Sequence, residues 1–195
     1  SGDTTPRRLV LIDCIDMPRA YELARSMGMG PVESLLKDVA TLLPLRLRPA
    51  PCEMLYTIAT GRFALLTRQE SRLTANWVAT KLAGISADIG DGLSVALMTH
   101  TGEASFKTGE LPAKEILRRA LSALHEAITR DIASMPFSEA TDTRHTQDFT
   151  LMHDLATAIR QDKGLWLAYQ PKICLHSGKP IGLEALIRWQ HPQRG

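Results

Sequence analysis

Carboxylate and guanidinium side chains stand at two places where they could bind metal or phosphate. Asp13 and Asp16 follow a short apolar run, and Glu184 and Arg188 lie within another. Carboxylate oxygens are ligands that divalent cations prefer, and the guanidinium fork matches the oxygens of a phosphate. Asp beside a residue such as Pro18 also commonly caps a helix. The residue types therefore leave a binding role and a structural role open at the first place.

The other metal-binding residue types show no ligand spacing. The three cysteines are odd in number and widely separated, and the six histidines form no ligand spacing, so the sequence predicts neither a zinc site nor a disulfide framework. Free cysteines in or beside apolar runs favour a reducing cytoplasm. The N-terminus lacks the zones of a signal peptide, and no apolar run is long enough to span a bilayer. We therefore expect a cytoplasmic protein.

Composition narrows the function classes. Hydrophobic residues make up 44% and charged residues 23% of the 195 residues, as in soluble globular proteins. The formal net charge of +2 gives no strong field that would attract nucleic acid.

The spacing of apolar residues predicts strands that alternate with helices. Short runs of branched residues indicate strands, and apolar residues repeating every three or four positions indicate helices. Chain breaks are expected at 27–31 and 44–51, and a turn at 88–92. The expected strands are 8–15, 54–59, 63–67, 93–99, 165–175 and 180–189, and the expected helices are 19–27, 32–43, 72–83, 112–132 and 149–161.

This order predicts an α/β (α+β) sandwich, with helices packed on a mainly antiparallel central sheet. Thr60-Gly61-Arg62 separates two apolar runs, as in a β-hairpin. Residues 135–146 lose periodicity and gather Ser, Thr, Asp and Pro, so we expect a linker there. The linker would separate a domain at 1–134 from a segment at 147–195.

The C-terminal segment resembles the opening of EAL-family phosphodiesterases. The residues that carry the resemblance are Tyr169-Gln170-Pro171-Lys172, Gly182-Leu183-Glu184-Ala185-Leu186-Ile187-Arg188-Trp189 and His191-Pro192. The family has a barrel of the TIM type, which needs roughly 250 residues. We therefore expect 147–195 to be an N-terminal fragment that cannot close a barrel.

The resemblance implies roles for the strand residues in a complete EAL domain. Glu184 would be a metal ligand, with Mg²⁺ or Mn²⁺ activating a water to attack cyclic-di-GMP. Gln170, Leu186 and Arg188 would line the dinucleotide. The other metal ligands would come from segments outside these residues, so no cofactor is expected in this fragment.

Residues 8–132 resemble the GGDEF family of diguanylate cyclases, with the element order β-α-α-β-β-α-β. The signature hairpin falls at Ala59-Thr60-Gly61-Arg62-Phe63, where only the final Phe keeps the motif. The family uses glycines to approach phosphate and carboxylates to hold metal. Here Ala59 and Thr60 replace the glycines, and Gly61 and Arg62 replace the acids. We expect no cyclase activity, because losing one transition-state group costs ~10²–10³ in rate.

Other positions that the family uses have changed as well. The guanine-binding pair of the first helix corresponds to Ala24 and Arg25. The product-inhibition motif would fall at Ala50 and Glu53, without its arginine. Either Asp13 or Asp16 would be the metal-binding aspartate at the end of the first strand, acting alone. Arg62 would be either a phosphate contact or a solvated residue at the hairpin tip.

The resemblance implies a non-catalytic regulatory module of a bacterial cyclic-di-GMP signalling protein, attached to an EAL domain present in part. The alternative is a parent protein that hydrolyses cyclic-di-GMP and whose GGDEF-like domain binds GTP as an allosteric activator. Expected partners are cyclic-di-GMP through a complete EAL domain, GTP, and a second copy in a homodimer, but no nucleic acid. A membrane tether upstream in the parent chain stays open.

Overall fold

The computed structural model describes residues 5–15 and 17–193, which form two compact units that meet between Glu139 and Ala140. Each unit is described by itself. Asp16, one of the two candidate metal ligands, lies outside the described residues. Among the described residues, no helix combines the length and the apolar character that a bilayer span requires.

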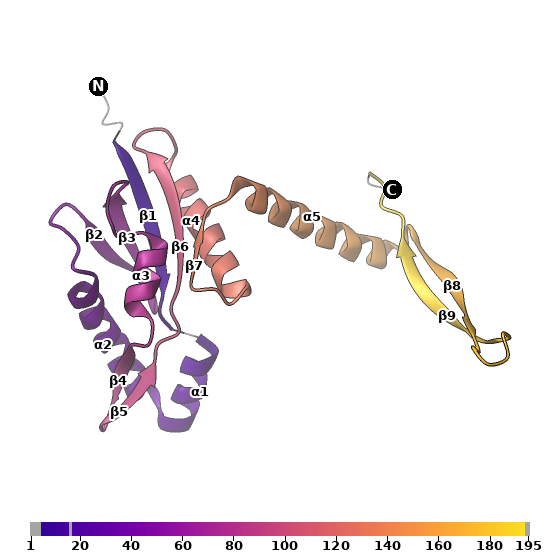
Figure 1. The fold of residues 1–195 in the computed structure, drawn as a ribbon, viewed down its shortest axis with the longest axis horizontal. Coiled ribbons are helices and arrows are strands. Elements are labelled where there is room, and N and C mark those ends of the chain that lie inside the picture. Colours follow the sequence, from indigo (N-terminus) through magenta and orange to yellow (C-terminus); the bar gives the residue numbers. More distant parts are fainter. Residues whose placement is uncertain (1–4, 16, 194–195) are drawn as a thin grey trace. The chain divides into compact units, whose positions relative to one another are not determined.

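The N-terminal unit is built on a five-stranded sheet (Figure 1). The strand order is β2-β3-β1-β6-β7, and every neighbouring pair except β6 and β7 is antiparallel. The mainly antiparallel sandwich expected from the sequence is thus confirmed. The strands are β1 (Pro6–Asp13), β2 (Met54–Ala59), β3 (Arg62–Arg68), β6 (His100–Lys107) and β7 (Ser134–Pro136).

Helices cover both faces of this sheet, because alternate residues of β1 point to opposite sides. Val10 and Ile12 join a large apolar cluster with residues of α1 (Met17–Met27), α2 (Met29–Leu47) and α3 (Ala75–Leu82). Leu11 points the other way and packs with Ala120 and Leu124 of α4 (Ala113–Thr129). Figure 1 accordingly shows α3 and α4 on opposite sides of the sheet.

The contact between α4 and β6 depends on Gly102. A Cβ atom at this position would overlap the backbone nitrogen of Leu124, so the helix lies directly against the strand backbone. Leu124 is 1% exposed and Ala104 on the same strand is 2% exposed, which shows how closely the two elements pack.

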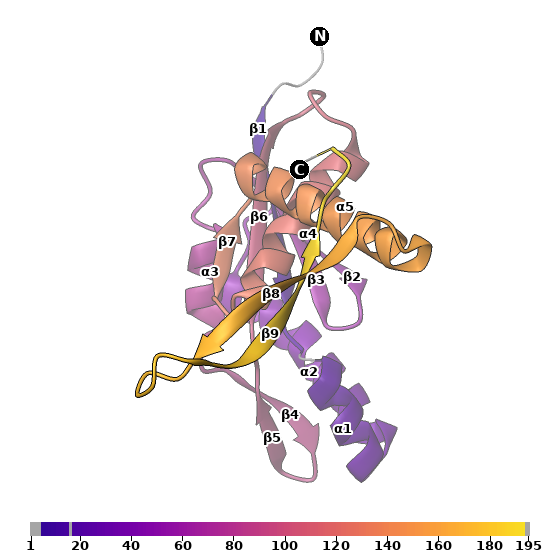
Figure 2. The same ribbon diagram turned by 90° about the vertical axis from the view of Figure 1, so that its right-hand side faces the viewer.

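A separate hairpin, β4 (Ser86–Gly90) and β5 (Leu93–Ala96), extends the unit at one end. Figures 1 and 2 both show this hairpin and α1 at the end of the sheet where β1 finishes. Ala87 and Ile89 are buried in the large cluster, so the hairpin covers part of α2.

The C-terminal unit contains α5 (Glu139–Gln161) followed by a long antiparallel hairpin of β8 (Leu165–Ile173) and β9 (Pro180–Trp189). This hairpin confirms the two strands expected over 165–175 and 180–189. Most side chains of both strands are exposed, including Leu183 at 67% and Ile187 at 65%. The described residues contain no closed barrel.

Four expectations about local structure were wrong. The expected break at 44–51 is helical as far as Leu47, because Pro44 is exposed at the last turn of α2 and Arg48 closes it with a bond from its N–H to the Pro44 carbonyl. The expected turn at 88–92 belongs to the β4–β5 hairpin, and the strand at 93–99 ends early at Ala96. The strand that joins the main sheet is β6, which was not expected.

The segment 135–146, expected as an irregular linker, is also regular. Met135 and Pro136 belong to β7, which pairs in parallel with β6, and α5 begins at Glu139. The domain boundaries at 134 and 147 stay a prediction, whereas the compact units meet within the expected linker.

Candidate functional site: the modified hairpin and the end of β1

The tip of the β2–β3 hairpin packs against the end of β1. Gly61 has a φ angle of 67°, a conformation that favours glycine. A Cβ atom there would lie 2.8 Å from the Cβ of Ile15, so a larger residue does not fit without a shift. The Gly61 carbonyl accepts a hydrogen bond of 3.0 Å from the Cys14 backbone nitrogen. These contacts fix the motif hairpin beside Asp13.

Asp13 and Arg62 form an ion pair at this place. They lie opposite each other in the β1–β3 register. The Nε atom of Arg62 donates to Oδ2 of Asp13 at 3.0 Å, and Nη2 donates to the same oxygen. The Asp13 side chain is 16% exposed and that of Arg62 is 34% exposed. A guanidinium thus neutralises Asp13, one of the two aspartates to which the family resemblance could assign metal binding.

On its other side, Asp13 is paired in register with His100 of β6. The Nε2 atom of His100 lies 3.4 Å from Oδ1 of Asp131, which follows α4. Arg62, Asp13 and His100 therefore form a row across three adjacent strands. This row borders a cavity of about 460 Å³ whose lining residues also include Ile15, Met98 and Ile128.

The row does not suit a divalent metal. Nowhere in the part of the chain that the structure describes do three or more His, Cys, Asp or Glu side chains stand where they could jointly hold an ion. Asp13 already accepts two hydrogen bonds from Arg62, whose positive charge opposes a second cation. That a single aspartate cannot serve the cyclase chemistry stays a prediction.

A second cavity, of about 270 Å³, adjoins the first through Ile15 and Met98. Its walls are mostly apolar, and α1 contributes Glu22, Leu23 and Ser26 to them. Ala24 and Arg25, which the resemblance aligns with the guanine-binding pair, are half-buried and exposed respectively and are not among its lining residues.

Cys14 lines this second cavity and is fully buried. Burial, with a smaller contribution from the nearby Asp13 charge, raises the pKa of the Cys14 thiol to about 12. The thiol is therefore protonated at neutral pH and acts as a small apolar group.

The place of the product-inhibition motif is occupied by a turn. The backbone nitrogen of Glu53 donates to the Ala50 carbonyl at 2.8 Å, and the Ala50 nitrogen donates to Oε2 of Glu53 at 2.8 Å. The carboxylate of Glu53 thus closes the connection before β2, and Ala50 offers no guanidinium to a dinucleotide.

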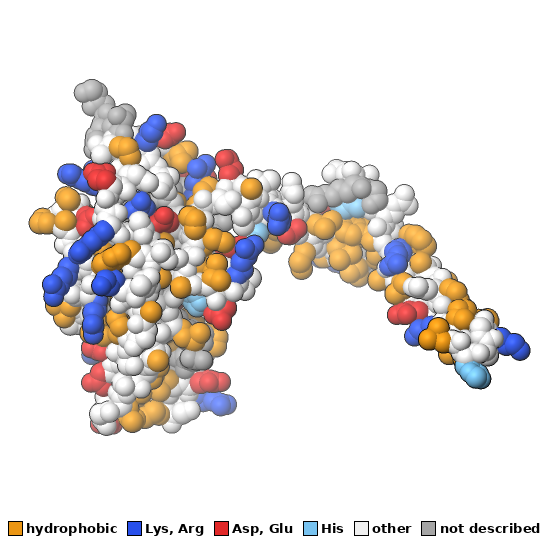
Figure 3. Space-filling model, in the orientation of Figure 1, with side chains coloured by type: hydrophobic (Ala, Val, Ile, Leu, Met, Phe, Trp, Pro, Cys, Tyr) orange, Lys and Arg blue, Asp and Glu red, His pale blue; other side chains and the backbone are white. Residues whose placement is uncertain are grey.

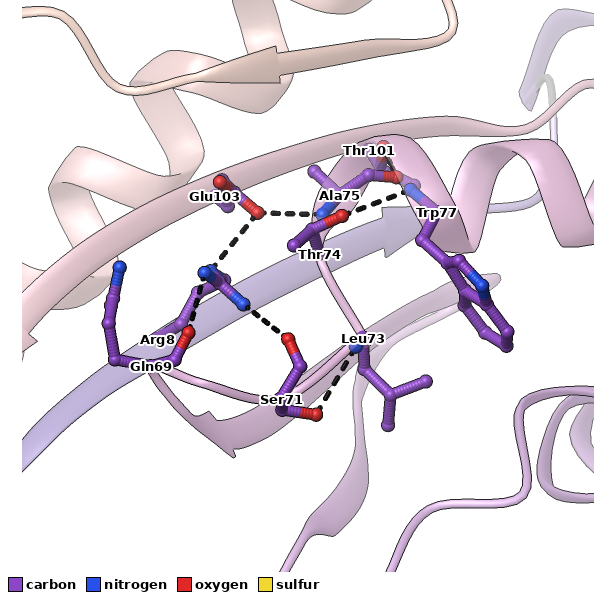
Figure 4. A network of polar contacts seen from close by, with 9 residues as sticks. All are labelled: Arg8, Gln69, Ser71, Leu73, Thr74, Ala75, Trp77, Thr101 and Glu103. Carbon is purple, nitrogen blue, oxygen red and sulfur yellow. Dashed lines mark hydrogen bonds and ion pairs between the residues drawn. The ribbon is translucent and has the colours of Figure 1, made fainter.

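A buried polar network on the α3 side of the sheet has a structural role (Figure 4). Arg8, 6% exposed, donates to the carbonyls of Gln69 at 3.0 Å and Ser71 at 3.2 Å. Its Nε atom lies 3.4 Å from Oε2 of Glu103, which accepts a bond of 2.6 Å from the Ala75 nitrogen. A carboxylate at the start of α3 interacts favourably with the positive end of the helix dipole. The network therefore holds this helix on the sheet.

The candidate residues of the EAL-like segment share one face of the β8–β9 hairpin. Gln170 lies opposite Glu184, and Leu186 and Arg188 follow at alternate positions of β9. Glu184 is 50% exposed and lies 3.9 Å from Nζ of Lys172. The charged neighbour of Glu184 is the cation Lys172, and no cluster of three or more His, Cys, Asp or Glu side chains occurs among the described residues. Glu184 by itself therefore does not fit a metal centre.

Sequence reasoning did not find the role of His191. Its ring is 7% exposed, its Nε2 atom lies 3.1 Å from Oδ2 of Asp154 in α5, and its Nδ1 accepts from the Gln193 nitrogen at 3.1 Å. Trp189 meets the ring edge-on at 4.9 Å. The position of His191 at the end of the EAL-like motif was the available signal, and it indicates that this histidine ties the hairpin to the helix.

Comparison with curated proteins finds relatives in cyclic di-GMP signalling, although no protein-family model matches the chain. The cyclic di-GMP phosphodiesterase PA2567 of Pseudomonas aeruginosa is 32% identical over 190 residues, which cover 96% of this chain and 32% of that protein. The phosphodiesterase NbdA of the same organism is 35% identical over 107 residues, covering 54% of this chain and 13% of NbdA. The chain therefore spans a third or less of the length of these relatives.

Solved structures with the same fold are GGDEF domains. The GGDEF domain of PA2567 superposes with a TM-score of 0.58 at 19% identity, covering 69% of this chain and 85% of that domain. The active GGEEF domain of a diguanylate cyclase from Vibrio cholerae gives 0.55 at 14% identity, with the same two coverages of 69% and 85%. The GGDEF domain of DgcB from Caulobacter crescentus, solved with c-di-GMP, gives 0.53 at 17% identity and covers 68% of this chain and 78% of that domain.

Likeness at this level of identity establishes the fold of the N-terminal unit, while the sequence match to PA2567 extends over nearly the whole chain. The GGDEF part of the resemblance is thereby confirmed: the N-terminal unit has the fold of a GGDEF domain, and the chain is similar in sequence to cyclic di-GMP signalling proteins.

Proposed function

We propose that the N-terminal unit is a non-catalytic regulatory module of a bacterial cyclic di-GMP signalling protein, attached to an EAL phosphodiesterase domain of which residues 147–195 are the first part. The observation that carries the proposal is the ion pair between Asp13 and Arg62. An active cyclase holds a metal-bound triphosphate at this hairpin, whereas here a guanidinium occupies the neighbourhood of the remaining acid.

Electrostatics supports the loss of catalysis. A divalent cation near Asp13 would have to displace Arg62 or tolerate its charge, and two unit charges at 4 Å interact by about 4 kcal/mol at a protein surface. Ala59, Thr60 and Gly61 bring no carboxylate that could compensate. The fold of an active cyclase is therefore kept without the charges that its reaction needs.

The first experiment is an activity assay. The protein is incubated with GTP and either Mg²⁺ or Mn²⁺, and the products are separated by chromatography. We expect no cyclic di-GMP. Its formation above a blank without protein would contradict the proposal.

A charge-reversal pair tests the physical reason. Arg62→Glu leaves Asp13 without its cation and adds a carboxylate beside it, so we expect new Mn²⁺ binding in an electron paramagnetic resonance titration, still without cyclic di-GMP synthesis. Arg68→Glu makes the same change of charge at the other end of β3 and should leave Mn²⁺ binding as in the unaltered protein. Equal Mn²⁺ binding by both variants would show that Arg62 does not block the site.

A second candidate is a domain that still binds GTP and activates a functional EAL domain in the longer protein. The two adjoining cavities favour it, because a mostly apolar space of about 270 Å³ lies beside one of about 460 Å³ that is bordered by the charged side chains of Asp13 and Arg62. Calorimetric titration with GTP and Mg²⁺ separates the two candidates. If no heat of binding is measured at millimolar nucleotide, the domain does not bind GTP and the first candidate stands. Saturable heat of binding, together with faster cyclic di-GMP hydrolysis by the longer protein, supports the GTP-binding candidate.

A further inference from the structure

Among the cationic side chains of the N-terminal unit that form no ion pair with a described acid, five lie near the end of α2 and around α3. Arg46 and Arg48 stand at the end of α2, Arg68 ends β3, Arg72 lies on the approach to α3, and Lys81 is in its last turn. All five are exposed. Figure 3 shows Lys and Arg side chains gathered over the region of α2 and α3 on the face turned to the viewer. We call these five residues the basic face.

The segments that carry the basic face are neighbours. The turn from Arg68 to Ser71, closed by a backbone bond of 3.1 Å, separates Arg68 from Arg72 by a few residues. The β2–β3 register places Met54 opposite Leu66, which brings the end of β3 close to the connection after α2. Buried Leu43 and Leu47 of α2 share one apolar cluster with Leu73.

Several other cations of the unit are paired with acids. Arg8 pairs with Glu103, Arg62 with Asp13, Arg119 with Glu115, and Arg130 with Glu126. Around the basic face, the carboxylate of Glu53 bonds to the Ala50 nitrogen, and Glu70 is the exposed acid between Arg68 and Arg72. The face therefore keeps a local excess of positive charge in a chain whose net charge is +2.

Trp77 holds two of these cations in place. The Arg72 guanidinium carbon lies 5.0 Å from the centroid of the indole ring, and Nζ of Lys81 lies 5.5 Å from it. Such contacts are favourable and orient a side chain without neutralising its charge. They also occupy the ring of Trp77, which is then not free to stack against a nucleic-acid base.

We propose that the basic face binds an acidic polypeptide segment of a partner protein. Complementary charge between surfaces guides association and excludes wrong partners. The cavities beside Asp13 and Cys14 and those bordered by Asp88 and Trp189 include none of the five cations in their linings, and all five side chains are exposed, so their charge lies on the open surface. The covered Trp77 ring argues against single-stranded nucleic acid.

Fluorescence anisotropy tests the proposal with the whole chain. The probe is a short labelled peptide of glutamate with interspersed leucine, and a lysine peptide of the same pattern is the control ligand. We expect saturable binding of the acidic peptide that weakens as salt is added, because exposed charges are screened. The double variant Arg72→Glu with Lys81→Glu should bind at least about tenfold more weakly.

A matched variant controls for net charge. Lys107→Glu with Lys114→Glu reverses two exposed lysines at the end of β6 and the start of α4, and it should keep the affinity of the unaltered protein within about twofold. Circular dichroism confirms that both variants are folded. Equal loss in both variants would reduce the interaction to overall charge and overturn the proposal.

Other anions provide the remaining tests. The labelled peptide is displaced in turn with short duplex DNA, with cyclic di-GMP, and with vesicles of phosphatidylcholine and phosphatidylserine. We expect an unlabelled acidic peptide to compete best. Stronger competition by DNA, by the dinucleotide or by the vesicles, lost in the Arg72→Glu and Lys81→Glu variant, would assign the basic face to that ligand instead and refute a polypeptide partner.

Discussion

The two units differ in how far they bury their apolar residues. The N-terminal unit encloses two clusters, in which residues such as Val10, Leu65 and Leu124 are at most 1% exposed. In the described part of the C-terminal unit, Ala158 is the buried apolar residue, and β8 and β9 leave theirs exposed. An isolated two-stranded hairpin is marginally stable in water. Regular hydrogen bonding is therefore present in both units, but a core is present in one.

This contrast shows that sequence patterning and stability are separate matters. β9 carries apolar residues at alternate positions, as a half-buried strand would, yet its exposed side chains gain little from the hydrophobic effect. The following changes test whether packing is confined to the N-terminal unit, and they run from the largest expected effect to the smallest.

Gly102→Val should have the largest effect. The added side chain would overlap the backbone of α4 at Leu124, and we expect a loss of more than about 3 kcal/mol in the free energy of unfolding, the upper range for overpacking. Gly182→Val in β9 meets no atom within 4 Å and should cost little. Urea unfolding is followed by Trp77 fluorescence in a background with Trp166→Phe and Trp189→Phe. A comparable loss from both valine variants would contradict the contrast.

Leu65→Ala should cost about 3 kcal/mol, because it leaves a cavity in a fully packed site. Ile187→Ala, at a side chain 65% exposed, should change stability by less than about 0.5 kcal/mol. The same unfolding measurement checks the first variant, and far-UV circular dichroism follows the second. If Ile187→Ala also lost several kcal/mol, β9 would have a packing partner.

Thiol labelling sharpens the comparison without any mutation. The Cys14 thiol is buried, and its pKa is raised to about 12. The Cys174 thiol is half-buried, and hydrogen bonds from Ser177 lower its pKa. At mildly alkaline pH, iodoacetamide should modify Cys174 at least about tenfold faster than Cys14, because the thiolate reacts. Peptide mass spectrometry gives both rates. Equal rates would show that the N-terminal core opens readily.

The smallest effect concerns the surface of α4. Hydrogen bonds from Arg118, followed by those from Arg119, lower the pKa of Glu115 to about 2. A carboxyl whose pKa is depressed on folding stabilises the protein above its unfolded value of 4.5 and loses that contribution as the pH falls toward 2. Glu115→Gln should therefore be slightly less stable than the unaltered protein at pH 7. The unfolding midpoints of the variant and of the unaltered protein should converge near pH 2. A difference that stayed the same at every pH would show that the Glu115 carboxylate is not its cause.

Much of the fold could be predicted where periodicity was strong. The β2–β3 and β8–β9 hairpins were expected within a residue or two, because each joins two apolar runs through a short polar turn. The strand β6 was missed because its sequence, His-Thr-Gly-Glu-Ala-Ser-Phe-Lys, is poor in large apolar residues. Small residues at Gly102 and Ala104 are what allow α4 to lie so close, so the tertiary contact explains the weak local signal.

The sequence identified the residues of the candidate site, but it did not predict which of them contact each other. Asp13 and Arg62 were both singled out, yet their pairing across 49 positions of the chain depends on the register of β1 against β3. The face shared by Gln170, Glu184 and Arg188 followed more directly, because alternate residues of paired strands point the same way. The link between His191 and Asp154 required the fold of the loop after β9.

The crowding at Gly61 also has a consequence for the history of the domain. An acidic side chain at this position would need a φ angle near 67° and would collide with Ile15, so one substitution cannot simply return the carboxylate. The space would have to be cleared at Ile15 first, a residue that is 7% exposed, and a smaller side chain there would reduce the packing of the core. Placing an acid at this position therefore requires at least two coupled changes, one at Gly61 and one at Ile15.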